Sequence, residues 1–159
     1  MLKFLPPALR GTIALTLLVC NTLFWCSLLF VLALAKLLLP LQGVRQRIDP
    51  LLNQIASCWV GCNSAWMRLT HGTVWDVAGV ADLAYQEWYL VNCNHQSWVD
   101  ILVLQRVFNR RIPLLKFFLK RELLYVPVIG LAWWALDFPF LRRQSKDDLR
   151  RNPGQRLAD

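Results

Sequence analysis

The chain has 159 residues, of which 56% are hydrophobic and 18% are charged. This length accommodates one domain of ordinary size. The composition is too apolar for a simple soluble domain and too charged for a polytopic channel, so it favours a membrane-attached enzyme or adaptor.

The formal net charge of +8 is concentrated in the C-terminal part of the chain. Twelve of the eighteen Lys and Arg residues lie from Arg106 to Arg156, together with only four acidic residues. Such a segment favours an anionic partner. We expect anionic lipid or a phosphorylated substrate, and no nucleic acid, because only the lipid partner also agrees with the apolar N-terminus. The five cysteines follow no zinc-ligand spacing, so we expect reduced thiols and no metal site.

Residues 12–35 form a run of 24 residues without a charge. As a helix this run would be about 36 Å long, enough to span a bilayer core with some tilt. A cleaved signal peptide is the alternative, since Lys3 and Arg10 precede the run and residues 33–35 have the small-residue pattern of a cleavage site. Apolar regions of signal peptides have only about 7–15 residues, so we favour an uncleaved membrane anchor.

A second helix is predicted for residues 49–72, with Asp49 as N-cap, Pro50 at the first helical position and Gly72 at the end. His71 is then a helix-end residue. One face of this helix is apolar, which predicts packing on the anchor or a place in the membrane interface. The apolar face consists of Leu51, Leu52, Ile55, Trp59, Cys62, Trp66 and Leu69, and the polar face of Asn53, Gln54, Ser57, Asn63, Ser64 and Arg68.

Residues 73–80 and 87–92 are rich in aromatic and β-branched side chains, which predicts two strands. A buried helix is predicted for residues 98–108, with Ser97 as its N-cap. Between the second strand and this helix lies the sequence NHQSWVD, which places His95 in a loop and Asp100 in the first helical turn.

His95 and Asp100 could not meet on one straight helix, where positions five apart point about 140° away from each other. With the bend between them, the carboxylate can accept the Nδ1 proton and leave Nε2 free as a general base. One alternative is a capped helix start with a structural histidine. Another is a covalent nucleophile, Ser97 or Cys93, activated by His95 as in hydrolases, although the chain has no GxSxG elbow.

The motif around His95 resembles the HX4D block of the glycerolipid acyltransferases, the family that includes lysophosphatidic acid acyltransferase. The matching positions are Asn94, His95, Gln96, Ser97 and Asp100. The stretch KRELLYVPVIG is similar to the family's link between its first and second motifs at Lys120, Leu123, Pro127 and Gly130. The stretch DFPFLRR is similar to the second motif at Phe140 and Arg143.

The resemblance implies an α/β fold, in which a membrane helix and an amphipathic helix precede the first half of an α/β acyltransferase core. We expect residues 1–72 to be the membrane-anchoring helical segment and residues 73–159 a partial catalytic domain. The second motif departs from the family at Asp137, where Gly is common, and at Arg142, where Asp or Asn is common. The third and fourth motifs should lie beyond residue 159, so we expect a C-terminally truncated chain.

The resemblance also implies the chemistry. His95 would deprotonate the acceptor hydroxyl, Asp100 would orient His95, and the alkoxide would attack an acyl thioester directly. Arg143 would bind the acceptor phosphate with its forked donors, and Lys120 is a second candidate. The expected partners are membrane lipid, a lysophospholipid acceptor and, as co-substrate, acyl-CoA or acyl carrier protein, with no further cofactor.

Residues 123–141 are apolar and long enough to span a membrane, but they contain Pro127, Gly130, Asp137 and Pro139. This pattern predicts a broken helix at the membrane interface followed by a strand. The expected location is a bacterial inner membrane, with the catalytic part facing the cytoplasm. Two other functions stay open: a basic membrane adaptor and a Ser/His lipid esterase.

Overall fold

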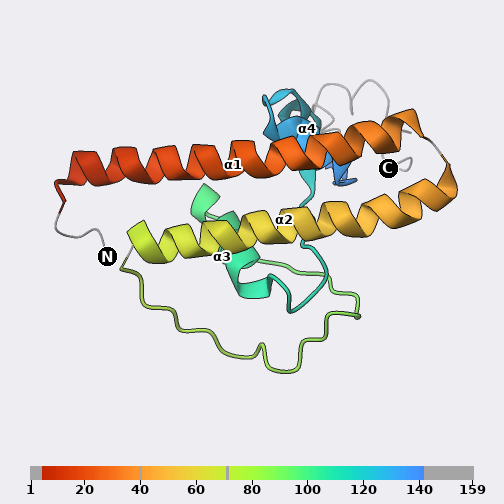
Figure 1. Ribbon diagram of the computed structural model, residues 1–159. Coiled ribbons are helices and arrows are strands. Elements are labelled where there is room, and N and C mark those ends of the chain that lie inside the picture. Colours follow the sequence, from red (N-terminus) through yellow and green to blue (C-terminus); the bar gives the residue numbers. More distant parts are fainter. Residues whose placement is uncertain (1–4, 40, 71, 142–159) are drawn as a thin grey trace, which may run out of the picture. The chain divides into compact units, whose positions relative to one another are not determined.

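The computed structural model describes residues 5–39, 41–70 and 72–141 (Figure 1). The chain divides into two compact units, residues 1–115 and residues 116–159, and each is described by itself. The predicted division into a membrane anchor (residues 1–72) and a partial catalytic domain (residues 73–159) is a functional one, and it stays a prediction.

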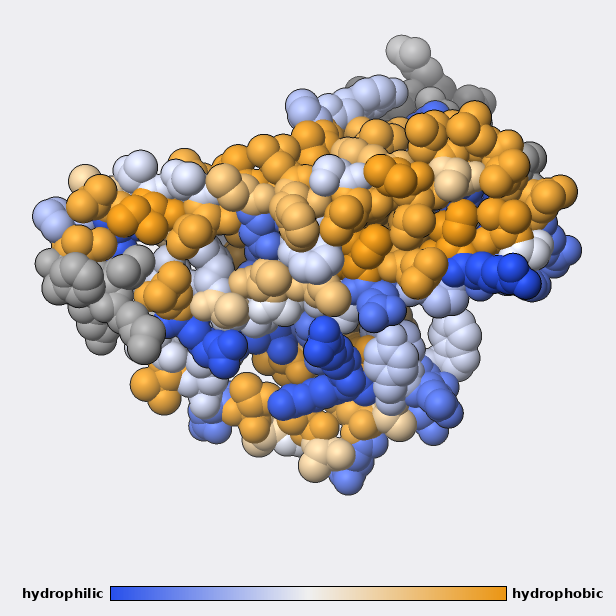
Figure 2. Space-filling view, in the orientation of Figure 1, coloured by the Kyte–Doolittle hydropathy of each residue, from blue (hydrophilic) through white to orange (hydrophobic). Residues whose placement is uncertain are grey.

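The first unit begins with the predicted apolar helix. Helix α1 spans Pro7–Leu38, with proline in its first turn, where the missing N–H costs nothing. In the described residues it is the one helix long and apolar enough to cross a membrane. Figure 2 shows an apolar surface along α1. The exposed apolar side chains of this helix include Leu15, Leu23, Phe24 and Val31.

Helix α2 spans Gln42–Thr70 and lies antiparallel beside α1 (Figure 1). The predicted start at Asp49 is wrong, because Pro50 lies inside the helix. Asp49 is therefore not an N-cap, and its carboxylate instead pairs with Lys36 of α1 at 2.9 Å. This ion pair links α1 to α2. The predicted end was Gly72, whereas α2 ends at Thr70; His71 lies outside the described residues.

The buried face of α2 also differs from the predicted apolar face. It consists of Ile48, Leu52, Ala56, Val60, Asn63, Met67 and Thr70. From the predicted apolar face, Trp59 and Trp66 hydrogen-bond to α1. Asn63, which was assigned to the polar face, is only 1% exposed because Asn21 of α1 donates to it at 2.8 Å. A polar partner on α1 thus places an asparagine in the core, which periodicity within α2 alone cannot predict.

The strands predicted at residues 73–80 and 87–92 are wrong: both segments are irregular. A strand needs a hydrogen-bonded neighbour, and within the part of the chain described here neither segment has one. Their β-forming side chains are open to solvent, as shown by Val74 at 92% and Trp88 at 97% exposed. By contrast, helix α3 spans Trp98–Phe108 with Ser97 as N-cap, as predicted. Its predicted burial is wrong, because none of its residues is buried and Trp98 is 71% exposed.

The second unit contains strand β1 (Leu119–Lys120), the 3-10 helix η1 (Arg121–Tyr125), helix α4 (Ile129–Ala135) and strand β2 (Phe140–Leu141). The two strands pair in parallel, with Leu119 opposite Phe140. The predicted α/β core is therefore seen, among the described residues, only as this short pair in a helix-rich chain. The predicted helix break and the following strand are present.

Gly130 allows α4 to pack closely on η1. A Cβ at this position would lie 2.2 Å from the backbone oxygen of Leu124, so no larger residue fits without moving the backbone.

Candidate active site

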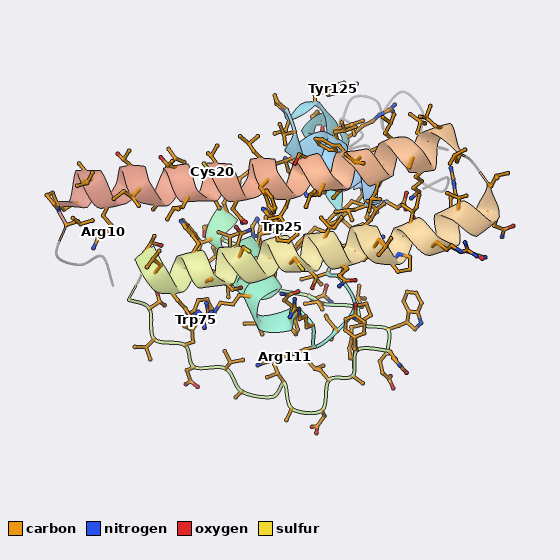
Figure 3. All side chains as sticks on the ribbon, viewed as in Figure 1. Arg10, Cys20, Trp25, Trp75, Arg111 and Tyr125 are labelled. Carbon is orange, nitrogen blue, oxygen red and sulfur yellow. The ribbon has the colours of Figure 1, made fainter. Side chains whose placement is uncertain are left out.

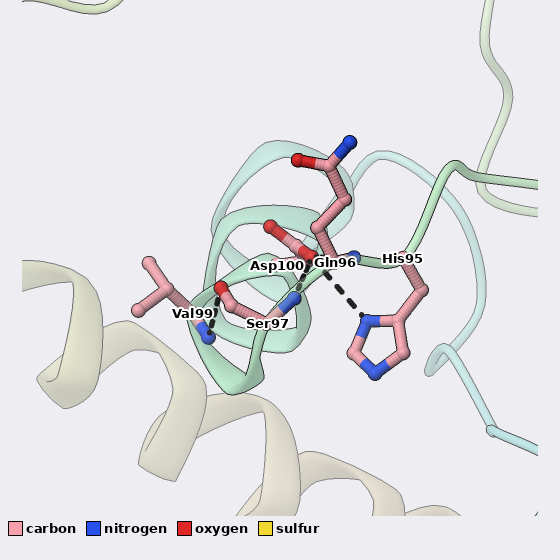
Figure 4. Close-up of polar contacts among 5 residues, drawn as sticks. All are labelled: His95, Gln96, Ser97, Val99 and Asp100. Carbon is pink, nitrogen blue, oxygen red and sulfur yellow. Dashed lines mark hydrogen bonds and ion pairs between the residues drawn. The ribbon is translucent and has the colours of Figure 1, made fainter.

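The candidate site is built on the first turn of α3, where one carboxylate holds the preceding loop. Asp100 Oδ2 accepts hydrogen bonds from the backbone N–H groups of Gln96 and Ser97, both at 2.6 Å (Figure 4). Ser97 Oγ accepts from the N–H of Val99 at 3.2 Å, which completes a capping box. The loop that carries His95 is therefore fixed to the start of the helix.

His95 and Asp100 face each other across this bend. Their Nδ1 and Oδ2 atoms are 3.4 Å apart, and Figure 4 shows the imidazole ring directed at the carboxylate. The distance exceeds the 2.6–3.2 Å typical of catalytic hydrogen bonds, which are often long before substrate binds. The histidine side chain is 57% exposed, so Nε2, on the opposite side of the ring from the carboxylate, is open to a substrate. The catalytic roles of both residues stay predictions.

The electrostatics of the pair favour an ionised carboxylate. The N–H groups of Ser97 and Gln96, followed by the charge of His95, lower the pKa of Asp100. A carboxylate held in its charged form can accept a hydrogen bond from Nδ1–H. It can also stabilise the imidazolium that forms when Nε2 takes a proton. The arrangement can therefore perform general-base chemistry.

The proposed roles of the other predicted site residues stay predictions. Lys120 is exposed in β1 of the second unit, and Arg143 lies outside the described residues. The hydroxyl of Ser97 accepts the Val99 hydrogen bond of the cap, while Cys93 is a free, exposed thiol. No group of three His, Cys, Asp or Glu residues that could hold a metal ion occurs among the residues described.

Sequence reasoning missed the polar side chains that attach α3 to α2. Arg106 of α3 and its C-cap residue Asn109 donate to the backbone oxygens of Ser64 and Ser57, respectively. The partners are 42 and 52 residues apart in the chain, so no local pattern marks them. An arginine and an asparagine near the end of an apolar helix were the only available signal.

The comparison with protein families agrees with the site. A family model described as Acyltransferase matches residues 75–156, which is more than half of the chain and includes His95 and Asp100. The chain belongs to this family, that of the glycerolipid acyltransferases. No match was found among curated proteins or among solved structures.

Proposed function

We propose that the protein is a membrane-bound acyltransferase that moves a fatty acyl group from acyl-CoA or acyl carrier protein to the free hydroxyl of lysophosphatidic acid or a related lysophospholipid. The reaction would serve phospholipid biosynthesis or remodelling. The observation that carries this proposal is the His95–Asp100 contact, with Nε2 open to substrate, in a chain of the acyltransferase family.

In this mechanism Nε2 of His95 accepts the proton of the acceptor hydroxyl. The oxygen attacks the thioester carbonyl, and a tetrahedral intermediate forms and collapses with cleavage of the carbon–sulfur bond. The leaving thiolate takes the proton back from His95, which regenerates the base. Asp100 keeps its charge throughout and holds Nδ1–H, and a positioned base of this kind contributes roughly 10²–10⁴-fold in rate.

The membrane location is supported by α1. An acyl acceptor with a long chain partitions into the bilayer, so an enzyme that acts on it works at the membrane surface. We assign residues 1–72 to the anchor and residues 73–159 to the catalytic part, on the cytoplasmic side of a bacterial inner membrane. Lys120 and Arg143 are the proposed phosphate-binding residues, because their positions match the family motifs and their charges suit a phosphate.

The test is an acyl-transfer assay on membranes that contain the chain, with lysophosphatidic acid and labelled oleoyl-CoA. We expect His95→Ala to lower the rate by roughly 10²–10⁴-fold. The matched control is Gln86→Ala, at an exposed position of the preceding loop, which should leave the rate unchanged. An unchanged rate in His95→Ala would refute general-base catalysis, and stoichiometric labelling of Ser97 by a serine-reactive phosphonate would support the esterase instead.

A further inference from the structure

Two polar contacts, one from Arg106 of α3 and one from its C-cap residue Asn109, attach α3 to α2. Ser57 Oγ donates to Asn109 Oδ1 at 2.5 Å, and Asn109 Nδ2 donates to the Ser57 backbone oxygen at 3.1 Å. Arg106 Nη1 donates to the Ser64 backbone oxygen at 2.8 Å. All three hydrogen bonds are partly buried. We name the four residues Ser57, Ser64, Arg106 and Asn109 the polar clamp.

The spacing of the polar clamp restricts both rotation and sliding of α3. Ser57 and Ser64 are seven residues apart on one face of α2, and Arg106 lies in the last turn of α3, three residues before its C-cap residue Asn109. A single contact would leave α3 free to pivot, whereas two contacts about 10 Å apart along α2 fix its direction.

Arg106 also holds the segment that follows α2. Its guanidinium carbon lies 4.3 Å from the centre of the Trp75 ring, a cation–π contact. Figure 3 shows Trp75 beside α2, on the side where α3 lies. Burial, followed by the nearby charge of Arg68, lowers the pKa of Arg106, which indicates that the guanidinium is partly removed from water. The Arg106 guanidinium therefore contacts both Trp75 and the Ser64 backbone oxygen.

Helix α2 is in turn attached to α1 by polar contacts. Besides the Asn21–Asn63 pair, Trp66 Nε1 donates to the Ala14 backbone oxygen at 2.8 Å, and Trp59 Nε1 lies 3.3 Å from Thr22 Oγ1. A continuous series of contacts therefore runs from the apolar helix through α2 and the polar clamp to α3, whose first turn carries Asp100.

We propose that the polar clamp is a positioning device that fixes the His95–Asp100 pair relative to the α1–α2 hairpin, and so sets the pair at the depth of an acceptor hydroxyl in the membrane surface. This inference rests on the proposed function. The residues of the polar clamp touch no reacting atom, and they act on the His95–Asp100 pair through α3. The physical reason is that a displacement of about 1 Å between a base and its target can cost on the order of 10² in rate.

The first test measures amide hydrogen exchange of the full chain in phospholipid vesicles. In Asn109→Ala and Arg106→Met we expect α3 to exchange roughly tenfold faster, with α1 and α2 unchanged, because local opening of α3 no longer breaks the clamp contacts. Gln54→Ala, at an exposed position of α2, is the matched control and should exchange normally. Unchanged exchange of α3 in both clamp variants would overturn the proposal. If either variant unfolds the whole chain, Ser57→Ala, which removes one hydroxyl, decides the question in the same measurement.

The second test separates positioning from general damage to the fold. Acyl transfer is compared for lysophosphatidic acid in vesicles and for a short-chain lysophosphatidic acid that is monomeric in solution. We expect the clamp variants to lose at least about tenfold more activity on the vesicle acceptor than on the monomeric one, and Arg106→Lys, which keeps a donor for Ser64, to recover part of it. Equal losses on both acceptors would refute membrane positioning. If the unsubstituted chain acylates neither acceptor, the proposed function fails, while the exchange experiment still decides whether the clamp holds α3.

Discussion

Asp100 combines two roles that substitution can separate. Its Oδ2 atom accepts two backbone N–H groups at 2.6 Å, which caps α3, and it lies 3.4 Å from His95 Nδ1, where its charge would stabilise the imidazolium. Asp100→Asn keeps a side-chain oxygen for the two N–H groups but has no charge. Asp100→Ala removes both the cap and the charge.

We expect both variants to lose roughly 10²-fold or more in acyl-transfer rate, because a neutral side chain cannot stabilise the protonated base. Their effects on α3 should differ. In Asp100→Ala the amide exchange of α3 should be roughly fivefold faster, the usual effect of losing a helix cap, whereas Asp100→Asn should stay close to the unsubstituted chain.

The assay combines acyl transfer with amide exchange on the same preparations, and Ser97→Ala serves as the control. That variant weakens the cap at Val99 but leaves the His95–Asp100 contact in place, so its α3 should exchange faster while its rate changes much less than in the Asp100 variants. Full activity of Asp100→Asn would refute the reasoning, since it would show that the carboxylate charge is not needed. A rate loss in Ser97→Ala as large as in Asp100→Ala would show that the cap, and not the charge, supports activity.

Three further predictions concern pH and packing. The pKa of Asp100 is lowered in the folded chain, so the unfolded chain binds more protons in acid; the cap should be fully formed above about pH 4 and lost as pH falls further. Exchange of α3, corrected for its intrinsic pH dependence, should show this loss, and Asp100→Asn should not. Asn63→Ala should destabilise the α1–α2 hairpin by about 1–2 kcal/mol in denaturant titrations, because Asn21 loses its 2.8 Å partner. If the double variant Asn63→Ala/Asn21→Ala loses as much stability as the two single variants together, the Asn21–Asn63 hydrogen bond does not contribute as expected. Gly130→Ala should destabilise the second unit by about 1–3 kcal/mol in thermal or denaturant unfolding, because the new Cβ would meet Leu124. An unchanged transition would contradict this packing.

The local features of the chain were predictable from the sequence. The apolar run of residues 12–35 lies inside the observed α1, and the predicted helix at residues 98–108 with its Ser97 cap has the observed bounds of α3. Both follow from interactions between residues at most four positions apart, which the sequence displays directly. The resemblance to the acyltransferases is equally local, and the family match confirms the family.

Contacts between distant parts of the chain decided the rest. A strand needs a neighbouring strand to hydrogen-bond with, and β-forming side chains alone do not provide one. The segments at residues 73–80 and 87–92, which were predicted as strands, are not paired in the described structure. The burial of Asn63 depends on Asn21, and the attachment of α3 depends on Ser57 and on Ser64, 42 or more residues earlier in the chain.

The sequence by itself therefore determined the apolar helix, the capped α3 with its His95 and Asp100, and the family, because each is encoded in neighbouring residues. Only the tertiary structure decided which face of α2 is buried, where α2 begins and how α3 is held against it. The physical reason is that burial and hydrogen bonding of a polar side chain depend on the group opposite it, and folding, not the local pattern, chooses that group.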